Sequence, residues 1–317
     1  METQALHIIK STETIPVEHP VFLIFGQPGI GKTSLGYSAR NPLLLDFDQG
    51  SHRAINRLDT LQIDDWSGVA GLMEQAEALA AYDTIVVDTV GRCLDMLTAD
   101  IAITDPKKAP GGNLTLQGWG TLKNRFRTWM SNLRLLGKDV LLLAHDKEDK
   151  DGDTRIVRPD IAGGSFGEAM KIADFIGYLY MNGKDRVLDF NPTDRWTGKN
   201  PAQWAPLRVP APEKAAAFLA DLAIKGRECL CGLSNVSASV ASQVNDWRAH
   251  IQTFVTAEDF NRPIPEIKKL SGPVQPQVVK LLMDAALGKQ IPFDKVARRF
   301  VSSISTEPRP ESQESVL

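Results

Sequence analysis

The sequence predicts an α/β fold, with a mostly parallel sheet, helices on both faces and a hairpin at one edge, plus a small helical C-terminal region. Short apolar runs alternate with stretches of helical spacing through residues 1–190, which is typical of a doubly wound α/β domain. From residue 191 the chain becomes rich in proline and loses its periodicity, which indicates that this domain ends there.

Four apolar runs are the expected central strands of the sheet. They lack polar alternation, which is typical of strands buried on both faces. A weaker run, LQI, covers 61–63, and two runs at 175–181 and 186–190 flank the turn residues NGKD, which predicts the edge hairpin. The central runs are VFLIF at 21–25, LLLDF at 43–47, TIVVD at 84–88 and VLLLA at 140–144.

Apolar residues at helical spacing predict the helices between and after these strands. In the core they cover 31–40, 68–81 and 119–136, and in the C-terminal region they cover 213–225, 239–255 and 276–287. The predicted domains are a core at 1–190, a Pro-rich linker at 191–212, a helical C-terminal region at 213–300 and a disordered tail at 301–317.

The composition predicts a cytoplasmic protein without membrane contact. The chain has 317 residues, 43% of them hydrophobic and 24% charged, which is ordinary for a globular protein. Its three cysteines, Cys93, Cys229 and Cys231, lack the paired spacing of a zinc site and indicate no disulfide framework. No signal-like segment opens the chain, and no apolar run approaches the roughly 18 residues that span a bilayer.

The segment GQPGIGKT at 26–33 fits the pattern G-x-x-x-x-G-K-[ST] between a buried strand and a helix, which is the context that a phosphate-binding loop needs. Glycines allow consecutive backbone N–H groups to close around phosphate oxygens. We expect Lys32 to reach the β and γ phosphates and the Thr33 hydroxyl to bind Mg²⁺. The predicted ligand is ATP with Mg²⁺, and the predicted binding residues are Gly26, Gln27, Pro28, Gly29, Ile30, Gly31, Lys32, Thr33 and Ser34.

Carboxylates end two of the predicted strands at the edge where this loop lies. Asp88 ends TIVVD and is the predicted second magnesium residue, the alternative being a turn aspartate. Asp46 and Asp48 lie on either side of Phe47 in DFDQG, and one of them is expected to face the nucleotide. Asp48, later at the strand end, is predicted to orient the attacking water, the alternative being that both are solvated turn residues.

His145 directly follows the apolar run VLLLA. At that strand end its ring is predicted to sense the γ-phosphate and to pass the signal into the loop beyond. The alternative is a structural histidine. Lys32, Asp48 and His145 are thus the predicted catalytic residues.

With both Walker elements and the strand-end Asp48 and His145 in this order, residues 21–190 resemble the RecA-like recombinase branch of P-loop ATPases. More closely, LLLDFDQGSHRA, TIVVDTV, LLLAHDKE and DIAGGS resemble the bacteriophage AAA-type proteins that include the Sak group of single-strand annealing proteins. The resemblance implies a RecA-like ATPase that oligomerises on single-stranded DNA in phage recombination or replication, in the cytoplasm of the bacterial host. The position of Asp48 is commonly glutamate in the wider superfamily.

Proteins of this kind contact DNA through loops, and the candidates here are 100–118 and 146–164, which are long and contain glycine. The alternative is a pair of surface loops. The resemblance also implies a homo-oligomer or filament, in which a cation of the next protomer completes the site, and a single-strand binding protein is a further candidate partner. The predicted phosphate contacts are Lys107, Lys108, Arg155 and Arg158, and the candidates for the cation are Lys184, Arg186, Arg195 and Lys199.

Two other functions remain open on the sequence alone. One is a helicase loader or motor ATPase, and the other, from a different class, is a P-loop small-molecule kinase. A kinase usually carries an arginine-rich lid, for which the sequence offers no convincing segment. A GTPase is disfavoured because no N-K-x-D guanine motif occurs.

Overall fold

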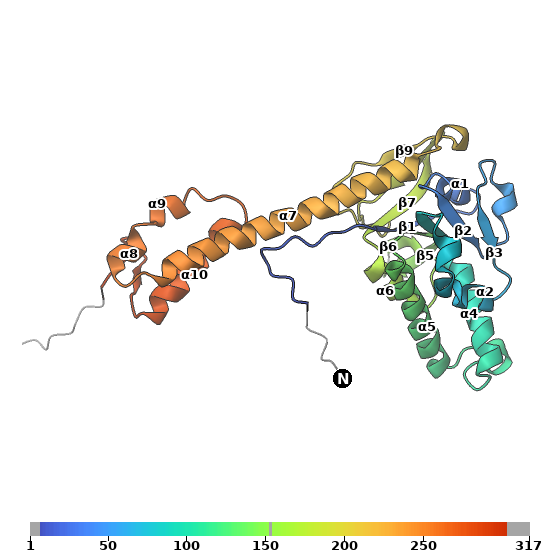
Figure 1. Cartoon of the computed structure of the whole chain (residues 1–317), viewed down its shortest axis with the longest axis horizontal. Helices are drawn as coiled ribbons and strands as arrows, with labels where there is room; N and C mark the ends of the chain where they lie inside the picture. The colour runs from blue at the N-terminus through green and yellow to red at the C-terminus, as the bar shows by residue number, and fades with distance from the viewer. Residues whose placement is uncertain (1–6, 152–153, 303–317) are drawn as a thin grey trace, which may run out of the picture. The chain divides into compact units, whose positions relative to one another are not determined.

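The computed structural model describes residues 7–151 and 154–302. The chain divides into two compact units (Figure 1). The first runs from Val17 to Cys231, and the second combines the residues up to Pro16 with those from Gly232 onward. No helix in the described part of the chain has the length and apolar character needed to cross a membrane.

The first unit is built on a nine-stranded sheet with the order β3-β2-β4-β5-β1-β7-β8-β9, and β6 pairs with β5 off this path. In this order, the six neighbouring strands β3, β2, β4, β5, β1 and β7 pair in parallel. The strands β6, β8 and β9 are antiparallel to their neighbours. The predicted mostly parallel sheet and the predicted hairpin, β7–β8, are confirmed, and β9 adds one further strand at that edge. The strands are β1 Val21–Gly26, β2 Pro42–Asp46, β3 Thr60–Gln62, β4 Thr84–Asp88, β5 Asp139–Asp151, β6 Thr154–Pro159, β7 Phe175–Asn182, β8 Asp185–Asp189 and β9 Leu207–Val209.

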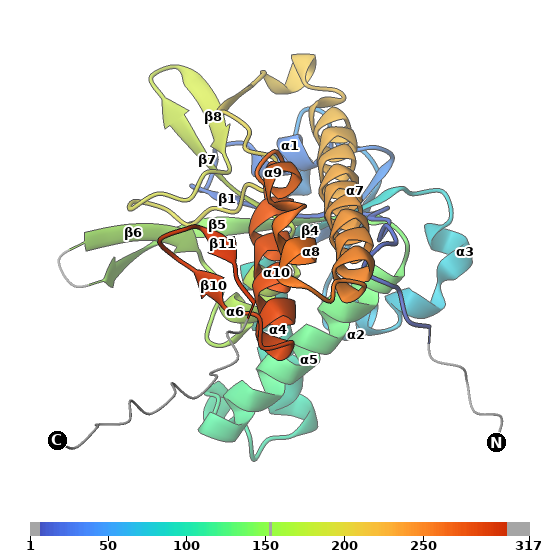
Figure 2. The ribbon, with the colours of Figure 1, turned by 90° about the vertical axis from the view of Figure 1, so that its left-hand side faces the viewer.

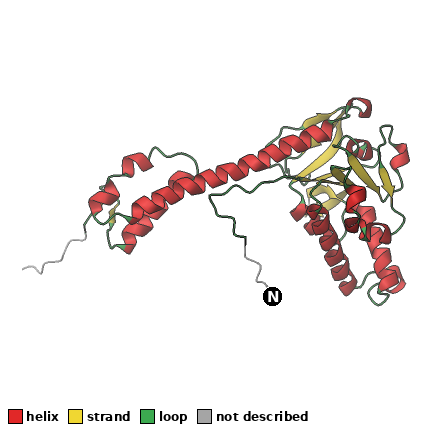
Figure 3. Cartoon of the chain, in the orientation of Figure 1, coloured by secondary structure: helices red, strands yellow, loops and turns green. Residues whose placement is uncertain are grey.

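Helices cover both faces of this sheet, as predicted (Figure 3). Alternate residues of β1 enter two hydrophobic clusters, because side chains along a strand point to opposite faces. Leu23 and Phe25 pack in the cluster of α4, α5 and α6, whereas Phe22 and Ile24 pack in the cluster of α1 and the start of α7. These helices are α1 Lys32–Gly36, α4 Val90–Thr104, α5 Leu116–Leu135, α6 Ser165–Ile172 and α7 Phe218–Gln252.

The structure divides one of the predicted helices into pieces and joins two others. The stretch at 68–81 forms only short pieces, α2 Ser67–Ala70, η2 Leu72–Glu74 and α3 Ala76–Leu79. The separate helices predicted at 213–225 and 239–255 are one helix, α7. At Gly226, which directly follows the first of these stretches, a Cβ atom would come within 3.0 Å of Phe175 and 3.1 Å of Phe22, so close packing on the sheet accounts for the glycine.

The predicted linker at 191–212 is part of the first unit. It contains the edge strand β9, which pairs with β8, and its Trp204 ring stacks on Phe175 with centroids 4.8 Å apart. Proline is tolerated beside an edge strand, so Pro206 and Pro210 do not exclude a strand here. The remaining short helices of this unit are η1 Ser51–Arg53, η3 Pro110–Gly112 and η4 Pro212–Lys214.

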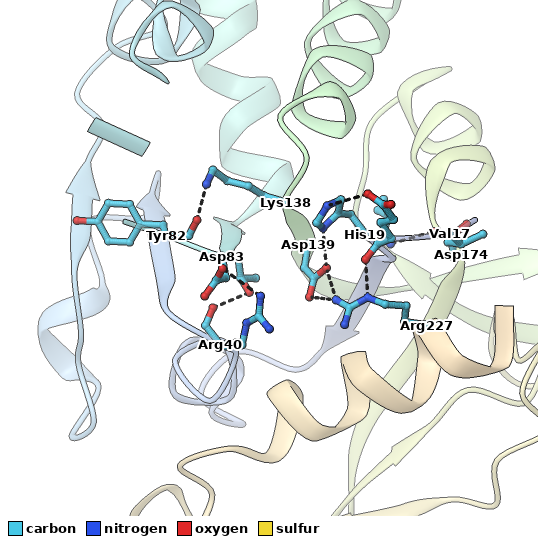
Figure 4. Close-up of polar contacts among 12 residues, drawn as sticks. Val17, His19, Arg40, Tyr82, Asp83, Lys138, Asp139, Asp174 and Arg227 are labelled. Atoms are coloured by element: carbon cyan, nitrogen blue, oxygen red, sulfur yellow. Dashed lines mark hydrogen bonds and ion pairs between the residues drawn. The ribbon is translucent and has the colours of Figure 1, made fainter. Parts of the chain in front are cut away.

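An ion-pair network attaches the start of α7 to the amino-terminal edge of the sheet (Figure 4). Arg227 Nη2 lies 3.0 Å from Asp139 Oδ1 and 3.2 Å from Oδ2, and its Nε donates to the carbonyl of Glu18. His19 Nδ1 lies 3.4 Å from the same carboxylate. Asp139 is the first residue of β5, so these contacts hold the beginning of this strand in place. His145, further along the same strand, lies at the candidate site.

The second unit has its own small core and is mostly helical (Figure 2). Thr256 and Asp259 form the predicted helix cap, in which each side chain bonds the backbone N–H of the other, and these bonds lower the pKa of Asp259 to about 2. The helical region ends in a two-stranded hairpin, which the sequence did not predict. Of the predicted tail, 303–317 lies outside the described residues. The elements after α7 are α8 Ala257–Asn261, α9 Ile264–Ile267, α10 Val274–Gly288, β10 Phe293–Asp294 and β11 Arg299–Phe300.

Candidate nucleotide-binding site

The segment predicted to bind phosphate is the loop between β1 and α1. Gly26 ends β1, where a Cβ atom would lie 2.3 Å from the carbonyl oxygen of Leu179, so only glycine fits against β7. Gly29 and Gly31 have φ angles of 80° and 92°, a conformation that side chains other than glycine rarely adopt. The glycines therefore sit where the backbone requires them, and the loop has the form predicted for residues 26–33.

Lys32 is folded into the loop. Its Nζ atom donates to the carbonyls of Gly26 and Gln27 at 2.8 and 2.9 Å, and it lies 3.2 Å from Nδ1 of His145. The side chain is only 5% exposed. Burial lowers the pKa of Lys32, and the nearby carboxylates, Asp88 first among them, act in the opposite direction. The ammonium group thus has three neutral partners and no direct carboxylate contact among the described residues, which leaves its charge available for an anion.

The predicted magnesium residues are in direct contact. The Thr33 hydroxyl donates to Asp88 Oδ2 at 2.7 Å. Burial raises the pKa of Asp88 to about 6, and the charges of Asp48 and Asp46 add to this, against the Thr33 hydrogen bond and Lys32. Hydroxyl and carboxylate oxygens are the hard ligands that Mg²⁺ prefers. The pair therefore fits a magnesium ion that also keeps waters and substrate oxygens, and no cluster of three or more His, Cys, Asp or Glu able to hold a metal exists among the described residues.

The two aspartates after β2 have different surroundings. Asp46 is 2% exposed and accepts hydrogen bonds from the backbone N–H groups of Gly50 and Ser51 at 3.1 and 2.9 Å, so it closes its own turn. Asp48 lies past the end of β2, with Oδ2 at 3.5 Å from His145 Nε2. Of the two, Asp48 is the one that faces the loop lysine and the histidine, and its role in orienting water remains a prediction.

The sequence did not single out Arg92, which completes this group. It lies in the first turn of α4, a helix that the sequence analysis missed, and its Nε atom is 3.4 Å from Asp48 Oδ1. Burial acts to raise the pKa of Asp48, but the hydrogen bond from His145 and the charge of Arg92 hold that pKa below its ordinary value. The carboxylate is therefore ionised at neutral pH, as a general base must be.

His145 is brought to the site by the sheet register. It pairs with Gly26 across β1 and β5, and its ring lies between Lys32 and Asp48. The next residue, Asp146, accepts a hydrogen bond from Tyr178 on β7 at 3.2 Å. Burial and this carboxylate raise the pKa of Tyr178 to about 12. Asp146 and Tyr178 are further residues at this edge, and no sequence pattern pointed to them.

The segments predicted to contact DNA are less irregular than expected. Residues 100–104 belong to α4 and 116–118 to α5, so the first loop is 105–115. The second segment is mainly a hairpin, in which β5 continues past the sheet and pairs with β6. The run DKEDKD at 146–151 is charged at every position and lacks apolar alternation, which hides this hairpin in the sequence. Three of the four predicted cations pair with carboxylates: Lys108 with Asp105 at 2.9 Å, Arg155 with Glu148 at 3.5 Å, and Arg158 with Asp149.

The candidates for a cation from a neighbouring protomer divide into two kinds. Lys184 and Arg195 are exposed, and Lys199 donates from Nζ to the carbonyl of Ala173 at 2.5 Å. Arg186 instead contacts the P-loop of its own chain, with Nη1 at 3.4 Å from the carbonyl oxygen of Ile30. For Arg186 the structure thus places a contact in cis where the sequence suggested one in trans.

A protein-family model described as an AAA domain matches residues 18–202, which is more than half of the chain. The chain belongs to this AAA domain family. The match covers β1 to β8, and this AAA domain has the predicted RecA-like P-loop NTPase fold. Among solved structures, a KaiC-like protein, PH0186, from the hyperthermophilic archaeon Pyrococcus horikoshii OT3 is similar, at 11% identity and a TM-score of 0.31, over 56% of this chain and 86% of that one. No curated protein matches the sequence.

Proposed function

We propose that this AAA domain protein binds and hydrolyses ATP with Mg²⁺, that single-stranded DNA stimulates the hydrolysis, and that it acts in phage DNA recombination by promoting annealing or strand pairing. One observation carries the proposal. His145, which touches the P-loop lysine, lies on β5 at the point where the strand leaves the sheet and begins the β5–β6 hairpin. A single strand therefore joins the nucleotide site to a predicted DNA-binding segment.

The residues of the site divide the chemistry of phosphate transfer among them. Lys32 would face the β and γ phosphates of a bound nucleotide, and Thr33 and Asp88 would hold a magnesium ion, which would neutralise negative charge in the site. Asp48, kept ionised, orients the attacking water and accepts its proton. Arg92 holds that carboxylate in place, and His145, which lies between it and Lys32, couples the site to β5.

The charges of the two DNA-binding segments support contact with phosphates. Lys107 is exposed. Lys108, Arg155 and Arg158 each form an ion pair with a carboxylate at the surface, and such a pair stabilises a protein by only about 0–1 kcal/mol. Such pairs can exchange their carboxylates for DNA phosphates at little cost. Because the chain carries a net charge of −3, these cations must hold the anionic DNA strand locally. We propose that several protomers assemble along the strand. A single-strand binding protein is a further proposed partner.

The test is ATP turnover with and without single-stranded DNA, at salt concentrations between about 50 and 200 mM. We expect DNA to raise turnover, and we expect DNA affinity to fall steeply with salt because bound phosphates release counterions. Turnover should also depend on protein concentration through assembly. Turnover indifferent to DNA, without detectable DNA binding, would favour the small-molecule kinase, and strand unwinding driven by ATP would favour the helicase motor.

A further inference from the structure

Arg186 on β8 lies against the phosphate-binding loop of its own chain. Its guanidinium donates from Nη1 to the carbonyl oxygen of Ile30 at 3.4 Å and from Nη2 to the carbonyl oxygen of Pro210. A Cβ atom at Gly31 would lie 2.6 Å from Nη1, which is closer than a methyl group can approach. The arginine therefore covers the Ile30–Gly31 peptide, and glycine at 31 is needed for this contact as well as for its backbone conformation.

The hydrogen bond to Ile30 has a consequence for the next amide. The Ile30–Gly31 peptide is trans, since the only cis bond among the described residues is Asp88–Thr89. In a trans peptide the C=O and the N–H point in opposite directions. Holding the Ile30 carbonyl toward Arg186 therefore turns the Gly31 N–H away from this cation, which keeps that donor available to an anion bound by the loop.

The charge of Arg186 acts in the same direction. No carboxylate of the described residues pairs with its guanidinium, whose two hydrogen-bond partners are neutral carbonyls. Arginine remains charged in proteins, so this cation places a positive charge beside Gly31, and Glu213 is the carboxylate whose charge acts on it without a direct ion pair. Because Nη2 bonds Pro210 directly after β9, the same side chain also joins the P-loop to the antiparallel edge of the sheet.

We propose that Arg186 is a positioning residue of its own chain's nucleotide site, which holds the P-loop in its anion-binding form and connects it to the β8–β9 edge. The inference rests on the proposed nucleotide binding at this loop. Arg186 acts through the Ile30–Gly31 peptide, so its loss should weaken nucleotide binding more than it slows the bound reaction.

The first experiment measures binding of a fluorescent ATP analogue, with KM and kcat, for Arg186→Ala, Arg186→Lys and a control, Arg208→Ala. Arg208 is a 76% exposed arginine on the neighbouring β9 that pairs with Asp185. We expect Arg186→Ala to weaken binding at least about tenfold, as for loss of a hydrogen bond from a charged group. The lysine variant should recover part of this, because one ammonium can replace one of the two bonds, and the control should bind normally.

Thermal melts without nucleotide separate this effect from a loss of folding, because Arg186 also bonds Pro210. If Arg186→Ala keeps its melting temperature within a few degrees and binds nucleotide as tightly as the wild type, the inference is wrong. If the wild type itself binds no nucleotide, the proposed function fails, and the inference fails with it.

The second experiment distinguishes action in cis from action in trans. Lys32→Ala and Arg186→Ala proteins are mixed, and their ATP turnover is compared with each alone. If Arg186 served the site of the neighbouring protomer, some sites in the mixture would be complete. Such a site would combine the intact P-loop of an Arg186→Ala chain with the intact Arg186 of a Lys32→Ala chain, and activity would return. We expect no recovery, because each chain would still lack a residue of its own site, and recovery would overturn the assignment.

Discussion

Lys32 Nζ and His145 Nδ1 lie 3.2 Å apart, and the chemistry of the two side chains fixes the direction of this hydrogen bond. A lysine ammonium has donors only, so Nδ1 must accept. In the neutral ring the proton then resides on Nε2, which lies 3.5 Å from Asp48 Oδ2. Lys32 thus donates to His145, and the protonated Nε2 of His145 faces Asp48. A movement of Lys32 would therefore alter the position of His145, which lies on β5 and contacts Asp48.

Replacement of Lys32 by alanine should abolish turnover and strongly weaken nucleotide binding. The variant removes the charge facing the β and γ phosphates and leaves the carbonyls of Gly26 and Gln27 without their donor. Turnover and binding of a labelled ATP analogue measure both effects. Lys171→Ala is the matched control, since Lys171 is 74% exposed, and an active Lys32→Ala protein would exclude the P-loop assignment.

Asp48→Asn should keep nucleotide binding but lose at least about tenfold in turnover, because it removes the base and retains the shape. The measurement is kcat beside the dissociation constant of the nucleotide. Asp95→Asn is the control, because Asp95 is the other carboxylate partner of Arg92, at 3.2 Å, and is 68% exposed. Normal turnover in Asp48→Asn would mean that another residue orients the water.

His145→Ala should leave basal turnover near normal and remove its stimulation by single-stranded DNA. Lys32 keeps its two carbonyl acceptors in this variant, whereas the connection from the nucleotide to β5 is lost. Stimulation is read as the ratio of turnover with and without DNA. The exposed His52 on η1 provides the control, and a stimulated His145→Ala protein would show that the signal takes another path.

Asp88→Asn should stabilise the protein at neutral pH in the absence of nucleotide. The folded pKa, about 6, lies above the ordinary value of 3.8, so the folded state binds more protons between about pH 4 and 6 and stability falls as pH rises through this window. The penalty is complete above about pH 6 and is on the order of 2–3 kcal/mol.

Thermal or urea unfolding from pH 4 to 8 measures this effect as the difference between Asp88→Asn and the wild type. The difference should be largest at pH 7 and above and should vanish near pH 4. Asp194→Asn, at an exposed position, should run parallel to the wild type. A difference that is independent of pH would mean that ionisation of Asp88 costs nothing.

Replacement of Lys107, Lys108, Arg155 and Arg158 by alanine should remove DNA stimulation and flatten the salt dependence of DNA binding, because each phosphate contact adds to the salt slope. Basal turnover should be unchanged, since none of the four contacts the nucleotide site in the structure. A protein that loses four exposed cations elsewhere, Arg40, Arg57, Lys171 and Arg208, controls for net charge. Equal DNA affinity in the two proteins would place the DNA on another surface.

The sequence by itself determined the central strands, the P-loop and the edge hairpin. Each depends on a local pattern: apolar runs for strands buried on both faces, glycines at fixed spacing for the loop, and NGKD for the turn of β7–β8. Asp88 follows from the same logic, because the carboxyl ends of parallel strands meet at one edge, and its 2.7 Å contact with Thr33 agrees with that expectation.

Only the tertiary structure decided which distant residues complete the site. Arg186 meets Ile30 because β8 reaches the loop at the antiparallel edge, 156 residues away in sequence, and Arg92 meets Asp48 because α4 begins directly after β4. The sequence also did not show the continuous α7 or the short β9. The reason for Gly226 is its packing against Phe175, and the prolines beside β9 are compatible with a strand only because β9 pairs with β8 at the edge of the sheet. Local patterns record periodicity and burial, whereas contacts such as these depend on the order of strands in the sheet, which no single segment encodes.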